Sequence, residues 1–206
     1  MTFPTSLVAT ELAAVNQILG AVGQAPVTTL DETNPDVAIA YNTLINTSRE
    51  IQGEGWSYNR EYEYPFTPNT NKEIEIATNI LAIDLSDLPQ NRGIDSVIRN
   101  GKLYNKTEHT YSWTNFTKVY CDVTWYFDFA DIPQSIRDYI IARASAMAAI
   151  QMVGNGDLYE MLTQREAVTR AAAIENDCLD GDYSIFGFPN GQNFYTSYQP
   201  YRSLIR

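Results

Sequence analysis

The stretch Lys118-Val-Tyr-Cys-Asp-Val-Thr-Trp-Tyr-Phe-Asp-Phe129 decides the fold class, because apolar side chains recur in it at every second position. Successive side chains of a β-strand point to opposite faces of the sheet. One face of this stretch would therefore carry six apolar residues: Val119, Cys121, Val123, Trp125, Phe127 and Phe129. The opposite face would carry mainly polar residues. This pattern predicts a half-buried antiparallel strand over the whole stretch.

The residues before this stretch predict further antiparallel strands. Asn100-Gly101 separates two short runs, 96–99 and 102–105, and is the strongest two-residue signal for a β-hairpin. Alternation of apolar with polar residues also occurs at Tyr62, Tyr64, Phe66, Ile74 and Ile76. Proline, asparagine and glycine residues between these runs favour turns. We therefore predict a β-rich domain over residues 57–130, inserted between two helical segments.

The residues on the N-terminal side of this domain predict two helices. Apolar residues at intervals of three and four form a stripe along one face of a helix. The stripe residues are Val8, Leu12, Val15, Leu19 and Val22 in the first helix, and Val37, Tyr41, Leu44 and Ile51 in the second. Gly23 and Pro26 end the first helix. In the second helix we expect Asn34 as the N-cap and Pro35 in the first turn, and Gly53 ends it.

The residues on the C-terminal side predict two more helices. Pro133 fits the first turn of a helix, and its stripe residues are Ile136, Ile140, Ala144 and Met147. Asp157 and Glu160 resemble a capping box that begins the last helix, which ends at Asp180-Gly181-Asp182. The sequence therefore predicts an α+β fold. Residues 1–56 and 131–182 form a discontinuous helical bundle of about four helices, and the antiparallel β-domain is inserted in it.

The final segment, residues 183–206, differs from the rest of the chain in composition. It contains seven aromatic residues and no Asp or Glu, and its glycine and proline residues disfavour regular structure. Aromatic residues and arginine are the residues that anchor protein interfaces. We predict an extended docking arm whose partner-binding residues are Tyr183, Phe186, Phe188, Phe194, Tyr195, Tyr198, Tyr201, Arg202 and Arg206. The alternative is that this segment packs back on the bundle of its own chain.

The composition excludes several classes of protein. The formal net charge is −11, from 14 Lys and Arg against 25 Asp and Glu. Tight, sequence-reading DNA binding needs clustered basic residues, so this charge argues against it, although DNA could pass an acidic surface without sticking. No stretch approaches the roughly 18 apolar residues of a membrane span, and the N-terminus lacks the basic region of a signal peptide. We expect neither a membrane span nor a cleaved signal peptide.

Residues that could hold a metal or act as nucleophiles are few. The chain has two cysteines, Cys121 and Cys178, and one histidine, His109, so one chain cannot supply four Cys or His ligands for a structural zinc ion. No Gly-rich phosphate-binding motif is present, and no Ser-His-Asp set has a convincing frame. We therefore expect no catalytic residues, no metal and no cofactor.

Pairs of acidic residues are the one enzyme-like feature: Glu61/Glu63, Glu73/Glu75, Asp84/Asp87 and Asp128/Asp131. Two carboxylates could act as acid and base on a glycosidic bond, which would make the β-domain a polysaccharide or cell-wall hydrolase. However, residues i and i+2 of a strand share a face, and such pairs commonly form its solvated outer side. We favour the second interpretation, in which the protein is not an enzyme.

The opening of the chain resembles that of a known family. The stretch Ala14-Val-Asn-Gln-Ile-Leu-Gly-Ala-Val-Gly-Gln-Ala-Pro-Val-Thr-Thr-Leu30 is similar to the start of the tail tubular protein A family, the head-to-tail adaptors of T7-like short-tailed bacteriophages. The resemblance continues in Arg49–Asn59, in Asp131-Ile-Pro133 with the helix after it, and in Ser203-Leu-Ile-Arg206. The β-rich part matches only loosely.

This resemblance implies a structural role in the virion. Family members are similar in forming a dodecameric ring beneath the portal protein and above the tail nozzle protein. The ring extends the channel through which genomic DNA leaves without specific binding. The resemblance thus implies a homo-oligomer in the virion tail, assembled in the host cytoplasm, with the tail fibre protein as a further candidate partner. Two alternatives stay open: the hydrolase described above, and a soluble scaffold that forms no ring.

Overall fold

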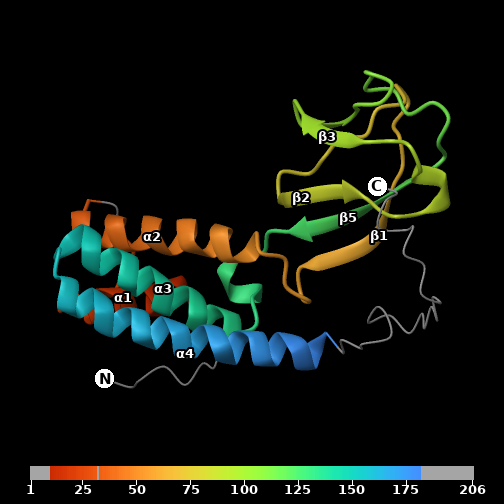
Figure 1. Ribbon diagram of the computed structural model, residues 1–206. Helices are drawn as coiled ribbons and strands as arrows, with labels where there is room; N and C mark the ends of the chain where they lie inside the picture. The colour runs from red at the N-terminus through yellow and green to blue at the C-terminus, as the bar shows by residue number, and fades with distance from the viewer. Residues whose placement is uncertain (1–9, 32, 182–206) are drawn as a thin grey trace. The chain divides into compact units, whose positions relative to one another are not determined.

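The computed structural model describes residues 10–31 and 33–181, which form four α-helices and five antiparallel strands (Figure 1). The chain divides into two compact units. The first unit comprises Met1–Glu54 and Phe127–Asp180, and in the described residues it contains the four α-helices. The described residues of the second unit are Gly55–Tyr126 and Gly181, and they contain the five strands. The α+β class with about four helices is confirmed.

In the first unit, α2 (Pro35–Gln52) begins and ends at the predicted residues. The side chain of Asn34 accepts a hydrogen bond from the amide of Asp36 (3.1 Å), and Gly53 follows the last helical residue. The preceding helix is α1 (Glu11–Ala21). Of the predicted stripes, Val15, Leu19, Val37, Leu44 and Ile51 are buried, Leu12, Val22 and Tyr41 are partly buried, and Val8 lies outside the described residues.

The central helix of the first unit is α3 (Gln134–Met152), which packs against the other three helices and buries eleven of its own residues. Its many alanine residues allow neighbouring helices to approach closely. The predicted stripe residues Ile136, Ile140 and Ala144 are buried, and Met147 is partly buried. Pro133 is the N-cap residue and does not belong to the first turn, so the prediction is wrong by one position.

The last helix, α4 (Gly156–Asp180), begins at a different cap from the predicted one. Oδ1 of Asn155 accepts hydrogen bonds from the amides of Asp157 (2.9 Å) and Leu158 (3.3 Å). The prediction of a capping box of Asp157 and Glu160 is therefore wrong, because Asp157 already lies inside the first turn. No described helix has the length and the apolar content that crossing a membrane requires.

Replacing Asn155 with alanine should lower the free energy of unfolding of the helical unit by about 1 kcal/mol, because two amides at the start of α4 lose their acceptor. Urea unfolding followed by far-UV circular dichroism measures this change. Asn155→Asp preserves a side-chain acceptor, so it is the matched control and should stay within a few tenths of a kcal/mol of the wild type. A stability of Asn155→Ala equal to that of the wild type would show that Asn155 does not cap α4.

In the second unit, β5 (Val119–Trp125) is the middle strand of a three-stranded antiparallel sheet, between β1 (Arg60–Phe66) and β2 (Ile80–Leu85). Figure 1 shows this order of strands. Of the predicted inward residues of β5, Val119, Cys121 and Val123 are buried and Trp125 is half-buried, and the intervening residues are half-buried except for the buried Thr124. The half-buried antiparallel strand expected from the sequence is thus present over these seven residues.

The hairpin predicted at Asn100-Gly101 is also present. It joins β3 (Ser96–Arg99) to β4 (Lys102–Asn105). The φ angles of Asn100 and Gly101 are 53° and 70°. Both values lie in the left-handed region, which Asn and Gly adopt most readily and which a tight two-residue hairpin turn needs.

The core of the second unit gathers residues from the sheet, the hairpin and the loops between them. Its buried members are Ile74, Leu103, Trp113, Val119, Cys121 and Val123. The indole Nε1 of Trp113 donates a hydrogen bond to the carbonyl of Leu103 (3.0 Å). The largest side chain of this core is therefore held by a polar contact as well as by packing.

β5 ends at Trp125, four residues before the predicted end of the strand. The amide of Phe127 donates to Oε1 of Gln52 (2.8 Å), and its carbonyl accepts from Nε2 of the same side chain (3.0 Å). Gln52 thus occupies the backbone groups that a longer strand would pair with a neighbour. Phe129 is buried in a short 3-10 helix, Phe129–Asp131, of the first unit. The prediction that the strand continues to Phe129 is wrong for this reason.

Ile74 and Ile76 do not lie in a strand either. Glu75 forms one isolated bridge with Lys102, and the amide of Ile76 donates to the carbonyl of Gly101 (2.9 Å). Ile74 is buried, so its apolar character reflects burial beside the hairpin. The alternation in the sequence correctly indicates which side chain faces the core, but a single bridge is too short to form a strand.

Candidate interaction surface

The predicted docking arm, residues 183–206, lies outside the described residues. The place where it leaves the bundle is described: α4 ends at Asp180, and Gly181 follows as a buried turn residue. The end of α4 and the surfaces beside it are therefore the described positions nearest in sequence to the arm.

The described carboxylates of the four acidic pairs do not form an enclosed catalytic pair. Seven of the eight residues are exposed, and the eighth, Glu73, is ion-paired with Nζ of Lys102 (2.6 Å). A glycosidase holds its two carboxylates on either side of the scissile bond, and exposed strand positions provide no such enclosure. Asp128 and Asp131 belong to the first unit and not to the β-rich one. The described residues give no support to the hydrolase interpretation.

The histidine and the cysteines occupy structural or exposed positions. His109 is an exposed turn residue with a φ of 56°. Cys178 is exposed on α4, whereas Cys121 is buried in the core of the second unit. Burial, with the nearby negative charges of Asp122 and Asp84, raises the pKa of Cys121 to about 12. Within residues 10–31 and 33–181, no cluster of three or more His, Cys, Asp or Glu side chains could hold a metal ion.

Iodoacetamide at neutral pH should modify Cys178 and leave Cys121 unmodified in the native protein. The thiolate is the reactive form, and the Cys121 thiol is both buried and held protonated by its raised pKa. Mass mapping of peptides after quenching identifies the modified residue. Unfolding in urea should make both cysteines react, which serves as the control. Modification of native Cys121 at the rate of Cys178 would contradict its position in the core.

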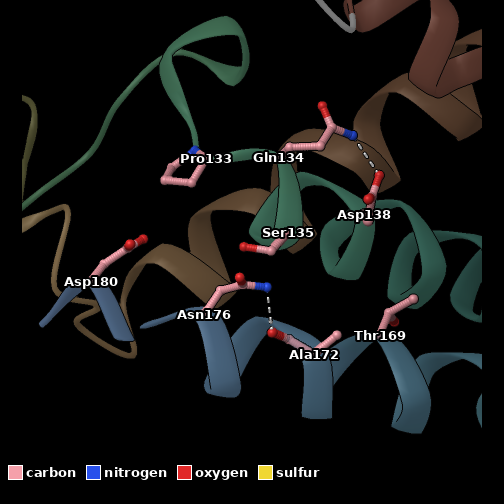
Figure 2. A pocket seen from close by; sticks show the side chains of 8 residues that line it. All are labelled: Pro133, Gln134, Ser135, Asp138, Thr169, Ala172, Asn176 and Asp180. Carbon is pink, nitrogen blue, oxygen red and sulfur yellow. Dashed lines mark hydrogen bonds between the residues drawn. The ribbon is translucent and has the colours of Figure 1, made fainter. Parts of the chain in front are cut away.

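A polar groove lies between the start of α3 and the second half of α4 (Figure 2). Its volume is about 490 Å³, and its lining residues are Pro133, Gln134, Ser135, Asp138, Thr169, Ala172, Asn176 and Asp180. Nε2 of Gln134 donates to Oδ1 of Asp138 (2.7 Å), and Nδ2 of Asn176 donates to the carbonyl of Ala172 (2.9 Å). Amide, hydroxyl and carboxylate groups of this kind suit hydrogen bonding to a polypeptide segment.

One side of α4 carries a row of exposed apolar residues, Met161, Val168 and Leu179, which we call the apolar line. Each of these residues keeps 69% of its surface exposed. At 3.6 residues per turn, the three positions lie within about 20° of one line along the helix. α4 has 25 residues but buries only Leu162 and Ala173. It therefore uses one narrow face for its own unit and leaves these three apolar side chains exposed on another face.

Ion pairs fix the orientation of α4. Arg143 of α3 donates hydrogen bonds to Glu166 of α4 (3.0 Å) and to Glu50 of α2 (2.7 Å). Arg170 of α4 lies 3.6 Å from the carboxylate of Glu54. Burial of Arg143 acts to lower its pKa. The interactions with Glu166 and Glu50 outweigh this effect and raise the pKa of Arg143, so its guanidinium stays charged. These contacts hold the face of α4 that buries Leu162 and Ala173 against the rest of the unit, and the apolar line lies on another face.

The apolar line was not predicted from the sequence, although a signal exists. Its residues are 7 and 11 positions apart, intervals that fall on one face of a helix. The sequence alone cannot distinguish such a stripe from one that faces the core, because apolar residues at helical spacing usually are buried. The distinction depends on which face of α4 packs against the other helices of its unit.

Comparison with known proteins identifies relatives of this chain. A family model described as tail tubular protein matches residues 12–183. Tail tubular protein A of Klebsiella phage KP34 is 25% identical over 156 residues, which is 75% of this chain and 79% of that protein. The family match spans the described parts of both units. It ends at Tyr183, so nearly all of the predicted docking arm lies beyond it.

Proposed function

Because this chain belongs to the tail tubular protein family, whose members are structural proteins of bacteriophage tails, we propose that it is a subunit of the adaptor ring that joins the portal to the tail nozzle. The ring would extend the channel through which the genome leaves the head. The observation that carries this proposal is the family match over residues 12–183, which includes helices and strands of both units.

Exposed apolar residues in both units support a role in assembly. In a ring of identical subunits, each contact joins two different surfaces of neighbouring copies. The first unit offers the apolar line of α4, and the second exposes Val97 and Ile98 on β3. We propose that the helical unit makes the contacts within the ring and that the β-rich unit meets the tail nozzle protein. The arm, residues 183–206, would reach a neighbouring subunit or the portal protein.

The charge of the chain supports its place beside DNA. A net charge of −11 repels the phosphate backbone, and phosphate contacts by clustered Lys and Arg are the main source of DNA affinity. A subunit of this charge can surround passing DNA without holding it. In this proposal the ring is assembled in the host cytoplasm, becomes part of the virion tail, and offers its outer surface to the tail fibre protein.

The proposal is tested by measuring whether the nozzle protein binds the portal only when this chain is present. Purified portal rings and nozzle protein of the same phage are mixed with or without the full chain and separated on a density gradient. We expect nozzle protein to sediment with the portal only when the chain is present. An unrelated acidic protein of similar size is the control for charge. Nozzle protein that binds the portal without the chain, or a chain that binds neither protein, would contradict the proposed role.

A further inference from the structure

The outer face of the β3–β4 hairpin carries a connected set of aromatic and basic side chains. Residues directly opposite each other in an antiparallel pair of strands point to the same face, as do residues two positions apart in one strand. Val97 is opposite Tyr104, and Arg99 is opposite Lys102, so these four residues share a face. Leu103 belongs to the opposite face and is buried in the core of the second unit. The face of Tyr104 is therefore the outer one.

Contacts between the side chains hold this face in shape. The guanidinium of Arg99 lies over the ring of Tyr104, 4.4 Å from its centroid. The rings of Tyr104 and Tyr111 meet edge to face with their centroids 4.9 Å apart, and Nδ2 of Asn100 donates to the hydroxyl of Tyr111 (3.3 Å). We call the set Val97, Arg99, Lys102, Tyr104 and Tyr111 the tyrosine face. Tyrosine and arginine are enriched among the residues that dominate the binding free energy of protein interfaces.

Arg99 is the cation of this face that can bind an external acid. Lys102 is ion-paired with Glu73 (2.6 Å), whereas within residues 10–31 and 33–181 no carboxylate is ion-paired with Arg99. Arg99 is exposed, and its stacked guanidinium presents N–H groups that match the geometry of a carboxylate. Arg99 and Tyr111 already occupy much of the Tyr104 ring, which leaves little of it for stacking on a sugar or a base. The tyrosine face therefore suits an acidic polypeptide surface.

A second copy of this chain supplies such a surface. Residues 92–106, which include the hairpin, contain four Lys or Arg and one Asp, a net charge of +3. The described residues of the helical unit contain 14 Asp or Glu and five Arg, a net charge of −9. Complementary charge steers two surfaces together and disfavours wrong combinations. The hairpin of one copy and the helical unit of another are therefore matched in charge.

The polar groove of the helical unit offers carboxylates to a guanidinium. Asp138 and Asp180 are exposed and line this groove from α3 and α4 (Figure 2). Asp180 is the last residue of α4, and the last turn of this helix contains no basic residue. The carbonyl groups at the C-terminal end of a helix carry partial negative charge and favour a cation there. An arginine from another molecule would add the positive charge that this end of α4 lacks.

We propose that the tyrosine face of one copy binds the helical unit of the next copy in the ring, with the guanidinium of Arg99 in the polar groove beside Asp138 and Asp180. The contact rests on the proposed ring and identifies two surfaces that meet in it. It joins two different surfaces of identical subunits, as a closed ring requires. The rest of the β-rich unit stays available to the tail nozzle protein.

Charge reversal on the two sides of the contact, in separate chains, tests this proposal. One chain carries Arg99→Glu, and the other carries Asp138→Arg with Asp180→Arg. The measurement is the amount of chain that sediments with purified portal protein. We expect each variant alone to bind at least roughly tenfold less than the wild type, because like charges then meet in every contact between copies. An equal mixture should bind as the wild type does, because two alternating variants place opposite charges in each contact.

Arg92→Glu is the matched control, since Arg92 is exposed in the same unit but lies outside the tyrosine face. It should bind as the wild type does. Far-UV circular dichroism checks the fold of each variant first, and Arg99→Asp or the lysine variants of Asp138 and Asp180 replace any that does not fold. Wild-type binding by Arg99→Glu would overturn the proposal, as would a loss that mixing does not restore, because a contact within one chain is not repaired by a second chain.

These outcomes are separate from a failure of the adaptor role. A wild-type chain that joins nozzle to portal, with an Arg99→Glu variant that does so equally well, would refute this contact and leave the proposed function intact. A wild-type chain that binds neither protein would contradict the proposed function itself.

Discussion

Replacement of Trp113 with alanine should unfold the β-rich unit while the helical unit stays folded. Trp113 is 1% exposed and packs among Leu103, Val119 and Cys121. Removing a buried tryptophan side chain costs about 3–5 kcal/mol. It also leaves the carbonyl of Leu103, which accepts from Nε1 at 3.0 Å, without this donor. This loss approaches the total stability of a small folded unit.

Urea unfolding measured with two probes separates the units. The tryptophan bands of the near-UV circular dichroism follow the β-rich unit, because Trp56, Trp113 and Trp125 all belong to it. Far-UV circular dichroism follows the helices. We expect Trp113→Ala to lose the near-UV transition and to keep the helical one. Trp113→Phe retains most of the volume and is the matched control, with an expected cost of about 1–2 kcal/mol. An unchanged near-UV transition in Trp113→Ala would contradict the buried position of this residue.

Removal of residues 183–206 should leave a folded protein that fails to join tails to heads. The described core residues of both units precede the cut, so we expect both units to stay folded. The deletion removes all nine residues predicted to bind partners, among them seven aromatic side chains. Aromatic anchors carry a large share of the free energy of binding at an interface, so the loss should be complete rather than partial.

This prediction is measured by counting the infectious particles that form when the shortened chain replaces the full chain. We expect none, while far-UV circular dichroism shows native helix content. Gln192→Ala combined with Gln199→Ala changes two polar residues of the same segment and should still yield infectious particles. If the shortened chain supports infection as the full chain does, the docking arm is not needed for joining.

Local signals in the sequence were sufficient wherever one residue type determines the backbone. Asn100-Gly101 predicted its hairpin because these residues adopt positive φ readily. Asn34 and Pro35 predicted the start of α2 because one accepts from an orphan amide and the other has a fixed φ. The alternation in β5 likewise identified Cys121 as a buried core residue.

Features that depend on a distant side chain were not predictable. Phe127 has the strand pattern, but Gln52 of α2 binds its amide and carbonyl, and the partner is 75 residues away in the sequence. Asn155 caps α4 in place of the predicted capping box. The cap lies two residues before the predicted start at Asp157, and its position depends on the conformation of the backbone before the helix. The exposure of the apolar line depends on which face of α4 packs on α3.

The mass of the complex that this chain forms with its portal shows whether the chain is a subunit of an adaptor ring. Light scattering during size-exclusion chromatography gives the mass of the portal alone, the chain alone and the mixture. We predict that the portal gains the mass of a ring of twelve 23.2 kDa chains, the number that the family resemblance implies. A chain that elutes as a 23.2 kDa monomer beside an unchanged portal would contradict it.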